Sequence, residues 1–376
     1  MSSTPIRILL LADTHLGLDL PVSPRIKRRR RGDDFLANYR QVLQRALGTP
    51  PIDLVVHAGD VFNRSRPNAT LAWQAFEPLV RVADAGVPVF IVPGNHERGR
   101  LPHLRFAKHP RIHVFDEPRT FEVTVRGARV ALAGFAFERE GVREAFPALL
   151  ERTGWRERAA DVRLLVLHQA VEGATVGPAD FTFTNGADVI RGRDIAEGLH
   201  AVLAGHIHRH QVLTHDLGRR ALAAPVLYPG SIERTSTAEA SEAKGYMLVN
   251  VTPAAQGAQG AQGARVTWEF HELPARPLVM RDLALGEESA AQLTERIRQL
   301  ICAAPEDAVL TIRVRDADGS PGRLPSAATL RAMAPATMNV ELRLPETRGG
   351  RGARGPRQRT RDAGPGEGTG QGDLFE

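Results

Sequence analysis

The feature that most constrains this chain of 376 residues is a strand-and-helix pattern repeated near its start. Apolar stretches of strand length occupy residues 6–13, 52–60 and 87–95, and each ends in Asp or Asn. Amphipathic helical patterns separate them over 33–47 and 68–86. Parallel strands need a crossover connection, and a helix commonly supplies it. The alternation therefore predicts parallel strands in an α/β sheet.

Residues that favour helix ends bound these two helical patterns. Asp33 or Asp34 is the expected N-cap of the first helix, and Asn68 is the expected N-cap of the second. Gly86 is expected to end the second helix, because glycine adopts the left-handed backbone conformation that commonly follows a helix.

The later sequence predicts two further units. Short strand patterns between about residues 120 and 273 have hairpin spacing and predict a second, more antiparallel sheet. From about Leu273 the pattern restarts as a βαβαβ unit with helices at 287–302 and around 324–333. Residues 346–370 are rich in Gly, Pro and Arg with almost nothing to bury, so we expect them to be disordered.

Polar side chains gather where the predicted strands end. These residues are Asp13, His15, Asp60, Asn95, His96, His168, His206 and His208. In open α/β sheets ligands bind at the carboxyl ends of the strands, so the repeated placement predicts one common site. A lone histidine after a strand is usually structural, and only the repetition argues for a site.

The side-chain types in this set match a metal centre. Carboxylate oxygen, amide oxygen and imidazole nitrogen suit Mn²⁺, Fe²⁺ or Zn²⁺, and no thiolate is among them. Apart from His96, the set offers seven ligands, more than one tetrahedral ion needs. It suits two ions that share a carboxylate, roughly 3.5–4 Å apart, an arrangement used to cleave phosphate esters.

At this point the motifs resemble those of a known family. In order, they are DTHLG, HAGDVFNRSRP, GNHE, AGHIHRHQ and YPGSIERTSTAEASEAKGY. The chain resembles the calcineurin-like metallophosphoesterase superfamily over roughly residues 5–345. The last motif narrows the resemblance to SbcD-like DNA-repair nucleases, bacterial kin of the eukaryotic double-strand-break repair nuclease.

This resemblance implies a domain organisation. It implies an α/β fold, a four-layer α/β/β/α sandwich over residues 1–275 that forms the metallophosphoesterase domain. A small C-terminal αβ capping domain would occupy 276–345. Composition, rather than this resemblance, predicts the disordered linker at 346–370, and residues 371–376 form a separate short peptide, the candidate clamp-binding peptide described below.

The resemblance also implies a role for each residue of the site. Asp13, His15, Asp60 and His208 would hold one metal ion. Asp60, Asn95, His168 and His206 would hold the other, with Asp60 bridging the two. His96 would stay unliganded and act as the catalytic histidine that faces the scissile phosphate. The cofactors would be two divalent ions, and Mn²⁺ is the ion we expect.

Three other functions stay open from the sequence. The same metal site could hydrolyse a small phosphodiester or a cyclic nucleotide. Arg64 and Glu97 resemble positions of protein Ser/Thr phosphatases, although the further arginine motifs of that family are not evident. A non-catalytic scaffold is the third alternative, but it usually loses ligands. Relatives often carry His where this chain has Asn63, which puts the strength of exonuclease activity in question.

Positive charge suggests a nucleic-acid partner. The formal net charge is +6, and the run RIKRRRR spans residues 25–31. Guanidinium groups suit phosphate, so the candidate DNA contacts are Arg25, Lys27, Arg28, Arg29, Arg30, Arg31 and Arg64. The alternative is a solvated basic loop that merely precedes the first helix.

Other partners are predicted from the family and from the tail. SbcD-like nucleases usually work with an SMC-like (SbcC-type) ATPase, yet this chain has no amphipathic helical pattern after Pro345 to bind it. Relatives often form homodimers. The ending QGDLF resembles a bacterial sliding-clamp-binding peptide, with Gln371, Asp373, Leu374 and Phe375 as its candidate contacts.

The remaining features predict location and structural roles. No stretch reaches the ~18 apolar residues that a membrane span needs, so we expect no membrane association and a cytoplasmic protein. The single cysteine, Cys302, excludes an internal disulfide and is expected to be buried in its helix. The histidines that match no motif are expected to be structural or on the surface: His57, His103, His109, His113, His200, His215 and His271. His210 lies beside the last two motif histidines and is expected in a groove or on the surface.

Overall fold

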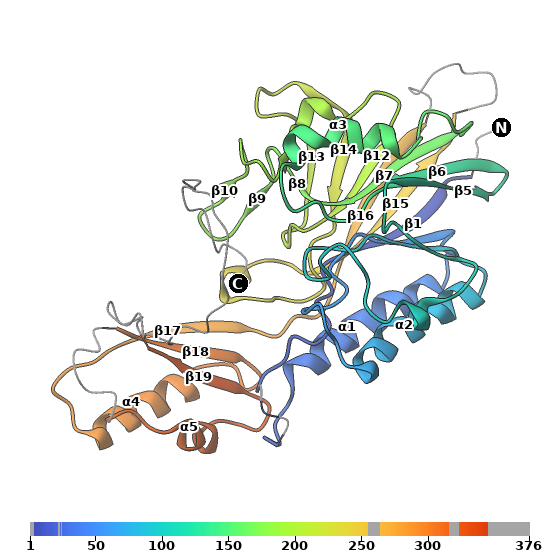
Figure 1. Cartoon of the computed structure of the whole chain (residues 1–376). Helices are drawn as coiled ribbons and strands as arrows, with labels where there is room; N and C mark the ends of the chain where they lie inside the picture. The colour runs from blue at the N-terminus through green and yellow to red at the C-terminus, as the bar shows by residue number, and fades with distance from the viewer. Residues whose placement is uncertain (1–3, 22, 24, 255–263, 316–322, 345–376) are drawn as a thin grey trace, which may run out of the picture.

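A computed structural model shows a large lobe that holds two long sheets and a smaller lobe at one end (Figure 1). It describes residues 4–21, 23, 25–254, 264–315 and 323–344. The predicted linker and the clamp-binding peptide lie outside these residues.

The first sheet confirms the predicted strand and helix alternation. Its order is β16-β15-β1-β2-β3-β4. The strands are β1 (Ile6–Leu11), β2 (Leu54–His57), β3 (Val89–Ile91), β4 (Ile112–Val114), β15 (Gly245–Thr252) and β16 (Arg265–Glu272). β1 to β4 pair in parallel, while β15 and β16 add antiparallel strands at one edge. Helices α1 (Arg31–Ala46) and α2 (Ala69–Asp84) cover its outer face.

The ends of these helices confirm two predictions and correct a third. Asn68 caps α2 by accepting a hydrogen bond from the Leu71 amide at 2.8 Å. Gly86 follows α2 with φ of +94°. The predicted cap of α1 is wrong, because α1 begins at Arg31 and its N-cap residue makes no side-chain cap bond. Asp33 and Asp34 lie in its first turn, where carboxylates favour the positive end of the helix dipole.

The second sheet has the order β13-β14-β12-β7-β6-β5. Its strands are β5 (Arg119–Val125), β6 (Ala128–Gly134), β7 (Val162–His168), β12 (Ala201–Gly205), β13 (Gln211–His215) and β14 (Ala221–Tyr228). Only the two edge pairs are antiparallel, and the centre is parallel. The predicted antiparallel character therefore holds only at the edges. Helix α3 (Val142–Arg152) packs on its outer face.

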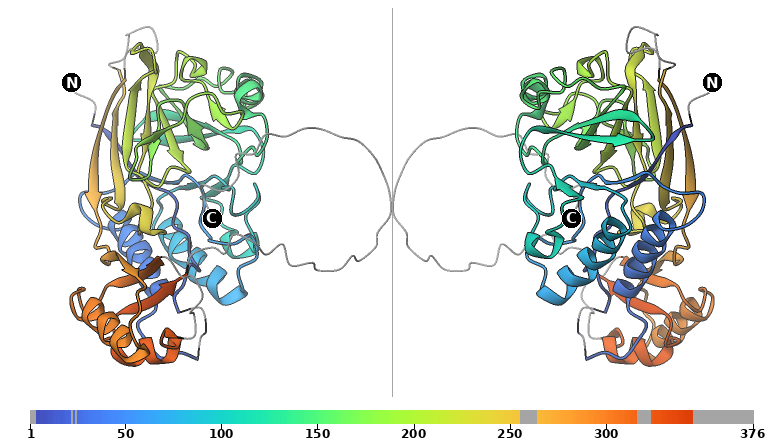
Figure 2. Two further views of the ribbon diagram at one scale, coloured as in Figure 1. Left: turned by 90° about the vertical axis from the view of Figure 1, so that its left-hand side faces the viewer. Right: turned by 90° about the vertical axis from the view of Figure 1, so that its right-hand side faces the viewer.

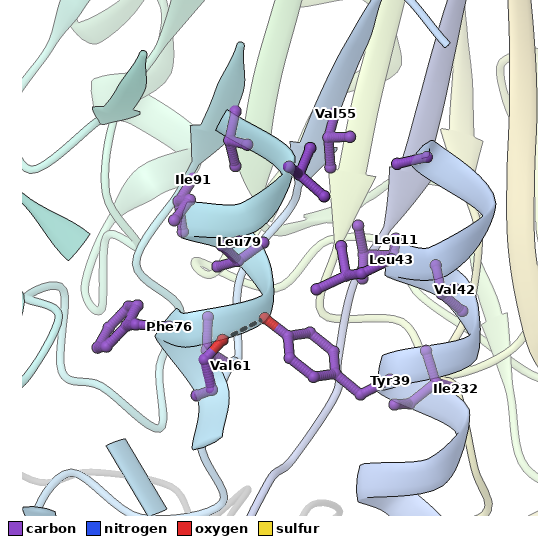
Figure 3. Packing of buried hydrophobic residues seen from close by; sticks show 14 of the residues in the cluster. Leu11, Tyr39, Val42, Leu43, Val55, Val61, Phe76, Leu79, Ile91 and Ile232 are labelled. Atoms are coloured by element: carbon purple, nitrogen blue, oxygen red, sulfur yellow. Dashed lines mark hydrogen bonds between the residues drawn. The ribbon is translucent and has the colours of Figure 1, made fainter. Parts of the chain in front are cut away.

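The two sheets pack face to face. Ile8, Leu10 and Val56 of the first sheet share a fully buried cluster with Leu132 and Val166 of the second. With the helices outside, the layers are α/β/β/α, as the resemblance implied (Figure 1). On the outer face of the first sheet, Tyr39 of α1 points toward α2, where its hydroxyl donates to the Ala75 carbonyl at 2.8 Å (Figure 3).

Short elements connect the long strands. They are β8 (Ala170–Val171), β9 (Thr175–Val176), β10 (Phe181–Thr182), β11 (Val189–Ile190), η1 (Leu104–Ala107), η2 (Gly192–Asp194) and η3 (Thr237–Glu239). β9 pairs with β10 and β8 pairs with β11. Of these elements, η3 matters most for the site described below.

The small lobe is the predicted βαβαβ unit. Its strands β17 (Leu278–Ala284), β18 (Val309–Arg315) and β19 (Asn339–Arg343) form a parallel sheet. Helices α4 (Ala290–Cys302) and α5 (Ala327–Met333) cover one face. The domain boundary at residue 275 stays a prediction.

Cys302 is exposed, so its predicted burial is wrong. Helix α4 buries Leu293, Ile297 and Ile301, which lie four residues apart along one face. Because each residue turns the helix by about 100°, the next residue points away from that face. Cys302 directly follows Leu300 and Ile301, and this short apolar run made the sequence predict burial for all three residues.

The small lobe lies beside α1 (Figure 2). The Arg28 guanidinium donates to the carbonyls of Pro335 at 2.6 Å and of Ala334 and Met338 at 2.9 Å. The same guanidinium also donates to the Arg331 carbonyl in the last turn of α5, where backbone acceptors lack helical partners. One basic side chain of the large lobe thus supplies the C-terminal cap of a small-lobe helix.

Among the described residues, no helix is both long and apolar enough to cross a membrane.

Candidate metal centre

The two sheets place the predicted residues at one edge of the sandwich. Asp13, Asp60 and Asn95 follow β1, β2 and β3 of the first sheet. His168 ends β7 and His206 follows β12, and these are neighbouring strands of the second sheet. All eight predicted side chains lie within this region, so the structure brings together residues far apart in sequence.

Tight turns after the strands position four of these side chains at the site. Asp13, His15, Asp60 and His206 have positive φ values of 51°, 40°, 53° and 85°, which non-glycine residues rarely adopt. Such conformations persist where the surroundings hold them, and they cluster at functional sites. Here the Asp13 amide donates to the Gly59 carbonyl at 2.9 Å and the His15 amide to the Asp60 carbonyl at 3.1 Å.

The first group of donors contains Asp13, His15, Asp60 and His208. The Nε2 atoms of His15 and His208 are 2.9 Å apart. His208 Nε2 lies 3.8 Å from Asp13 Oδ1, and His15 Nε2 lies 3.8 Å from Asp60 Oδ2. The side chains of Asp13, His15 and Asp60 are fully or almost fully buried.

The second group contains Asp60, Asn95, His168 and His206. Asn95 Oδ1 lies 2.9 Å from His168 Nε2 and 3.1 Å from His206 Nδ1. His168 Nε2 lies 3.4 Å from Asp60 Oδ2. Asp60 Oδ2 therefore belongs to both groups, the place that the resemblance implied for it.

The donors fit two divalent ions. An ion bound at ~2.0–2.2 Å holds neighbouring ligand atoms roughly 2.8–3.6 Å apart. The donor separations in both groups lie close to this range. Two imidazole Nε2 atoms 2.9 Å apart cannot both direct lone pairs at each other without repulsion, and a cation between them removes it. The mixed oxygen and nitrogen set suits Mn²⁺, Fe²⁺ or Zn²⁺.

The sequence model of the family described as calcineurin-like phosphoesterase matches residues 6–210, more than half of the chain. The chain belongs to this family.

Relatives with two different names match this chain over more of its length than the family model does. The DNA double-strand break repair proteins Mre11 of Archaeoglobus fulgidus and Haloferax volcanii are 25% and 28% identical, each over 82% of this chain. The matches span 68% and 61% of those two proteins. One subunit of the nuclease SbcCD of Bacillus subtilis is 26% identical over 83% of this chain and 80% of its own length.

Hydrogen bonds orient the histidines of the phosphoesterase site. A carbonyl only accepts, so His168 Nδ1 must donate to the Ala58 carbonyl at 2.7 Å. When the ring is neutral, its Nε2 lone pair faces Asn95 and Asp60. Burial opposes protonation of His168, but the Asp60 and Asp13 carboxylates outweigh it and raise the pKa of His168 to about 9. A bound cation would displace this proton, because metal ligands must be deprotonated.

His96 occupies the mouth of the site. Its Nδ1 lies 2.9 Å from the Asn63 carbonyl, so Nδ1 donates and Nε2 is left on the side of the ring that faces Asp60 and the pocket. The His96 side chain is 25% exposed, whereas those of His15 and His168 are buried. Its Nε2 is also 3.8 Å from Asp60 Oδ2, close enough to share an ion with His15 and Asp60.

These side chains border a pocket of about 210 Å³. Its lining residues are His15, Leu18, Asp60, Asn63, Asn95, His96, His206, His208, Thr235 and Ser236. Donors from both groups thus share one cavity with His96. Thr235 and Ser236 add hydroxyl groups from the segment that precedes η3.

Three residues support the site although the sequence did not predict their place beside it. His57 is buried beneath the site, with Nε2 3.0 Å from Thr14 Oγ1, and burial lowers its pKa to about 3. Glu97 accepts from the amides of Phe62 at 2.7 Å and Gly94 at 2.8 Å, and so ties two site loops together. Both are buried polar residues beside strand-end motifs, which is the signal that could have indicated them.

Glu239 is the third support. Its Oε1 lies 3.0 Å from His208 Nδ1. Its position, 31 residues beyond His208 and outside any strand-end motif, gave no signal for this contact.

The basic segment contributes less free charge than its sequence suggests. Arg28 donates to carbonyls in and just after the last turn of α5, Arg29 pairs with Asp34 at 2.8 Å and Arg30 pairs with Asp19 at 2.5 Å. The Arg31 side chain is only 2% exposed, and it pairs with Glu233 at 2.9 Å. Burial removes Arg31 from the surface.

The remaining predicted DNA contacts have a different setting. Arg25, Lys27 and Arg64 are exposed. DNA contact stays a prediction for these three residues, and they are the predicted cations best placed for it.

Proposed function

We propose that this phosphoesterase is a two-metal-dependent phosphodiesterase that acts on DNA in repair. The observation that carries the proposal is the pair of donor groups that share Asp60 on the floor of a pocket beside His96. Relatives named as a double-strand break repair protein and as a nuclease subunit support DNA as the substrate.

The residues would divide as the family resemblance implies. Asp13, His15, Asp60 and His208 would hold one ion, and Asp60, Asn95, His168 and His206 the other. Bound ions would lower the pKa of water and neutralise charge on the phosphate. We expect Mn²⁺ in both positions, because carboxylate, amide and imidazole donors without thiolate suit it.

His96 would meet the substrate. The Asn63 carbonyl holds its Nδ1 at 2.9 Å and so directs Nε2 toward the pocket. Protonated at Nε2, His96 would donate to a phosphate oxygen or to the leaving oxygen, the proton transfer that a positioned imidazole performs. Its partial exposure supports this role, because the leaving strand must depart through solvent.

The test is digestion of labelled linear and circular DNA in Mn²⁺, with purified wild type and His96→Ala. We expect wild type to cleave DNA and His96→Ala to be at least about 100-fold slower, since general acid–base catalysis contributes at least that much. His215→Ala, which changes a residue on the exposed end of β13, is the matched control and should keep full activity.

Other outcomes separate the alternatives. Hydrolysis of bis-p-nitrophenyl phosphate without cleavage of either DNA would overturn DNA as substrate and favour a small phosphodiester. Absence of both metal binding and turnover would leave the non-catalytic scaffold. Cleavage of linear but not circular DNA would assign exonuclease activity.

The proposed partners extend this function. An SMC-like ATPase and a second copy of the chain stay predictions, and the B. subtilis relative is named as one subunit of a nuclease. Sliding-clamp binding rests on the QGDLF ending. Loss of clamp co-elution in Leu374→Ala and Phe375→Ala variants would support it, and unchanged co-elution would exclude it.

A further inference from the structure

A buried acidic side chain lies behind His208. Imidazole nitrogens Nδ1 and Nε2 lie at different edges of the ring, and Nε2 is the atom that faces His15 and Asp13. At the other edge, Nδ1 lies 3.0 Å from Glu239 Oε1 and 3.1 Å from Thr235 Oγ1. Glu239 is on η3, a segment that none of the strand-end motifs includes.

A buried lysine fixes Glu239 in place. Lys244 has no exposed surface, and its Nζ lies 2.7 Å from Glu239 Oε2. The same ammonium contacts Glu242 Oε2 at 3.0 Å and donates to the His208 carbonyl at 2.9 Å. Lys244 therefore connects the carboxylate to the backbone of the histidine that this carboxylate contacts.

These contacts leave His208 only one proton arrangement as a neutral ring. The Glu239 carboxylate only accepts, and Thr235 donates its single hydroxyl proton to Glu239 Oε1 at 2.5 Å. Nδ1 must therefore carry the proton that points at these oxygens. Nε2 is left with its lone pair directed toward the first donor group.

The second donor group has a different support. His168 Nδ1 donates to the Ala58 carbonyl, which carries no net charge. An anionic partner raises the basicity of an imidazole more than a neutral partner does. His208 and His168, one histidine of each group, are thus supported unequally.

We propose that Glu239 is a positioning residue that makes His208 a stronger ligand and so strengthens the first metal position selectively, with Lys244 as its counter-charge. The proposal rests on the proposed function in one respect, the role of His208 as a metal ligand. It also gives a structural reason for the YPGSIERTSTAEASEAKGY stretch, which contains Thr235, Glu239 and Lys244.

Glu239→Gln is the decisive variant, because it keeps the shape of the side chain. Lys244 will hold the amide oxygen, so the amide nitrogen will face His208 Nδ1 as a donor. Nδ1 then faces a donor, so we expect it to accept and the proton to move to Nε2, where it blocks the lone pair. We expect calorimetric titration with Mn²⁺ to show one of two ions bound about 10- to 100-fold more weakly, and the other unchanged.

Glu242→Gln is the matched control. Glu242 also contacts Lys244 and pairs with Arg209 at 3.0 Å, but no contact joins its side chain to His208. It should bind both ions within about twofold of wild type. An equal loss of Mn²⁺ affinity in Glu242→Gln and Glu239→Gln would overturn the proposal, because the effect would then come from general disturbance of this segment.

A second readout needs no metal. Nitrogen-15 shifts of the metal-free protein report which imidazole nitrogen carries the proton, and the His208 signal is identified by its absence in His208→Asn. We expect Nδ1 protonation in wild type and in Glu239→Asp, and Nε2 protonation in Glu239→Gln. The same protonated nitrogen in wild type and Glu239→Gln would refute the proposal.

The two readouts separate this proposal from the proposed function. A wild type that binds no Mn²⁺ would refute the metal-dependent function and the selective effect on affinity together. A wild type that binds two ions, cleaves DNA and is unaffected by Glu239→Gln would refute only the positioning role. Should Glu239→Gln fail to fold, Glu239→Asp, which keeps the charge but retracts it, must weaken one ion selectively or the proposal fails.

Discussion

Arg276 donates to Asp34 Oδ2 at 3.1 Å, across the junction between the small lobe and α1. The Arg276 side chain is 3% exposed and also donates to the Thr337 carbonyl and to Asn339 Oδ1 at 2.7 and 2.8 Å. Asp34 is shared with Arg31, whose guanidinium lies 3.3 Å from the same oxygen. A buried ionic cluster therefore joins the two lobes.

Replacing Arg276 by methionine is expected to weaken this junction. It leaves buried acceptors without their donor, and breaking a buried pair costs about 3–5 kcal/mol. Urea unfolding should show that loss, and hydrogen exchange should increase in β19. Arg281→Met is the control, because the Arg281 guanidinium is exposed and donates to the Met280 carbonyl. Similar losses in both variants would contradict the role of the junction.

Removing the exposed cations is expected to weaken DNA binding without destabilising the fold. The logarithm of the DNA-binding constant falls linearly with the logarithm of the salt concentration, and each phosphate contact contributes about 0.9 to the slope. Arg25→Ala combined with Lys27→Ala should therefore make this slope about 2 less steep. Fluorescence anisotropy with labelled DNA at several salt concentrations measures this slope.

Arg31→Ala is the informative comparison for that experiment. Its guanidinium pairs with buried Glu233, so this variant should lower the thermal unfolding midpoint instead. An unchanged salt slope in the Arg25 and Lys27 variant would exclude both residues as phosphate contacts.

Divalent metal is expected to stabilise the folded protein. The donor groups converge only after folding, so an ion bound there adds about 2.7 kcal/mol at a concentration one hundred times its Kd. Thermal unfolding in Mn²⁺ and in EDTA measures the difference. The Asp60→Asn variant should lose most of the increase in unfolding temperature that Mn²⁺ causes, because Asp60 Oδ2 borders both donor groups. A full shift in Asp60→Asn would show that Mn²⁺ stabilises the protein elsewhere.

Gly94→Ala is expected to damage the site by steric contact. A Cβ at this position would lie 2.1 Å from Asp60 Oδ1 and 2.5 Å from the Asp60 nitrogen. Overpacking of this kind costs about 1–3 kcal/mol, and the displaced carboxylate should bind metal more weakly. Gly48→Ala is the control, since its Cβ would make an ordinary 3.5 Å contact with the Arg45 carbonyl. Calorimetry and urea unfolding compare the two variants.

The strand and helix pattern predicted the first sheet well, because each of its signals is local. A buried strand such as β2 is a short apolar run, and Asn68 caps α2 through a bond to a residue only three positions away. Sheet membership was harder. β15 and β16 join the first sheet rather than the second, because β15 pairs with β1 although about 240 residues separate the two strands in sequence.

The grouping of site residues was also accessible from sequence. Parallel strands of one sheet end at one edge, so strand-end residues such as Asp13 and Asp60 must be neighbours. The supports beneath them were not accessible. Glu239 reaches His208 through the path of a loop, and no local pattern encodes where such a loop will run.

The basic run shows the division between sequence and structure most clearly. The sequence by itself determined that residues 25–31 carry a dense positive charge and that strand ends carry metal-binding side chains. Only the tertiary structure decided that Arg31 is buried against Glu233 while Arg25 stays exposed. The reason is physical: charge is a property of each residue, but exposure depends on which distant carboxylates and carbonyls the fold brings within reach.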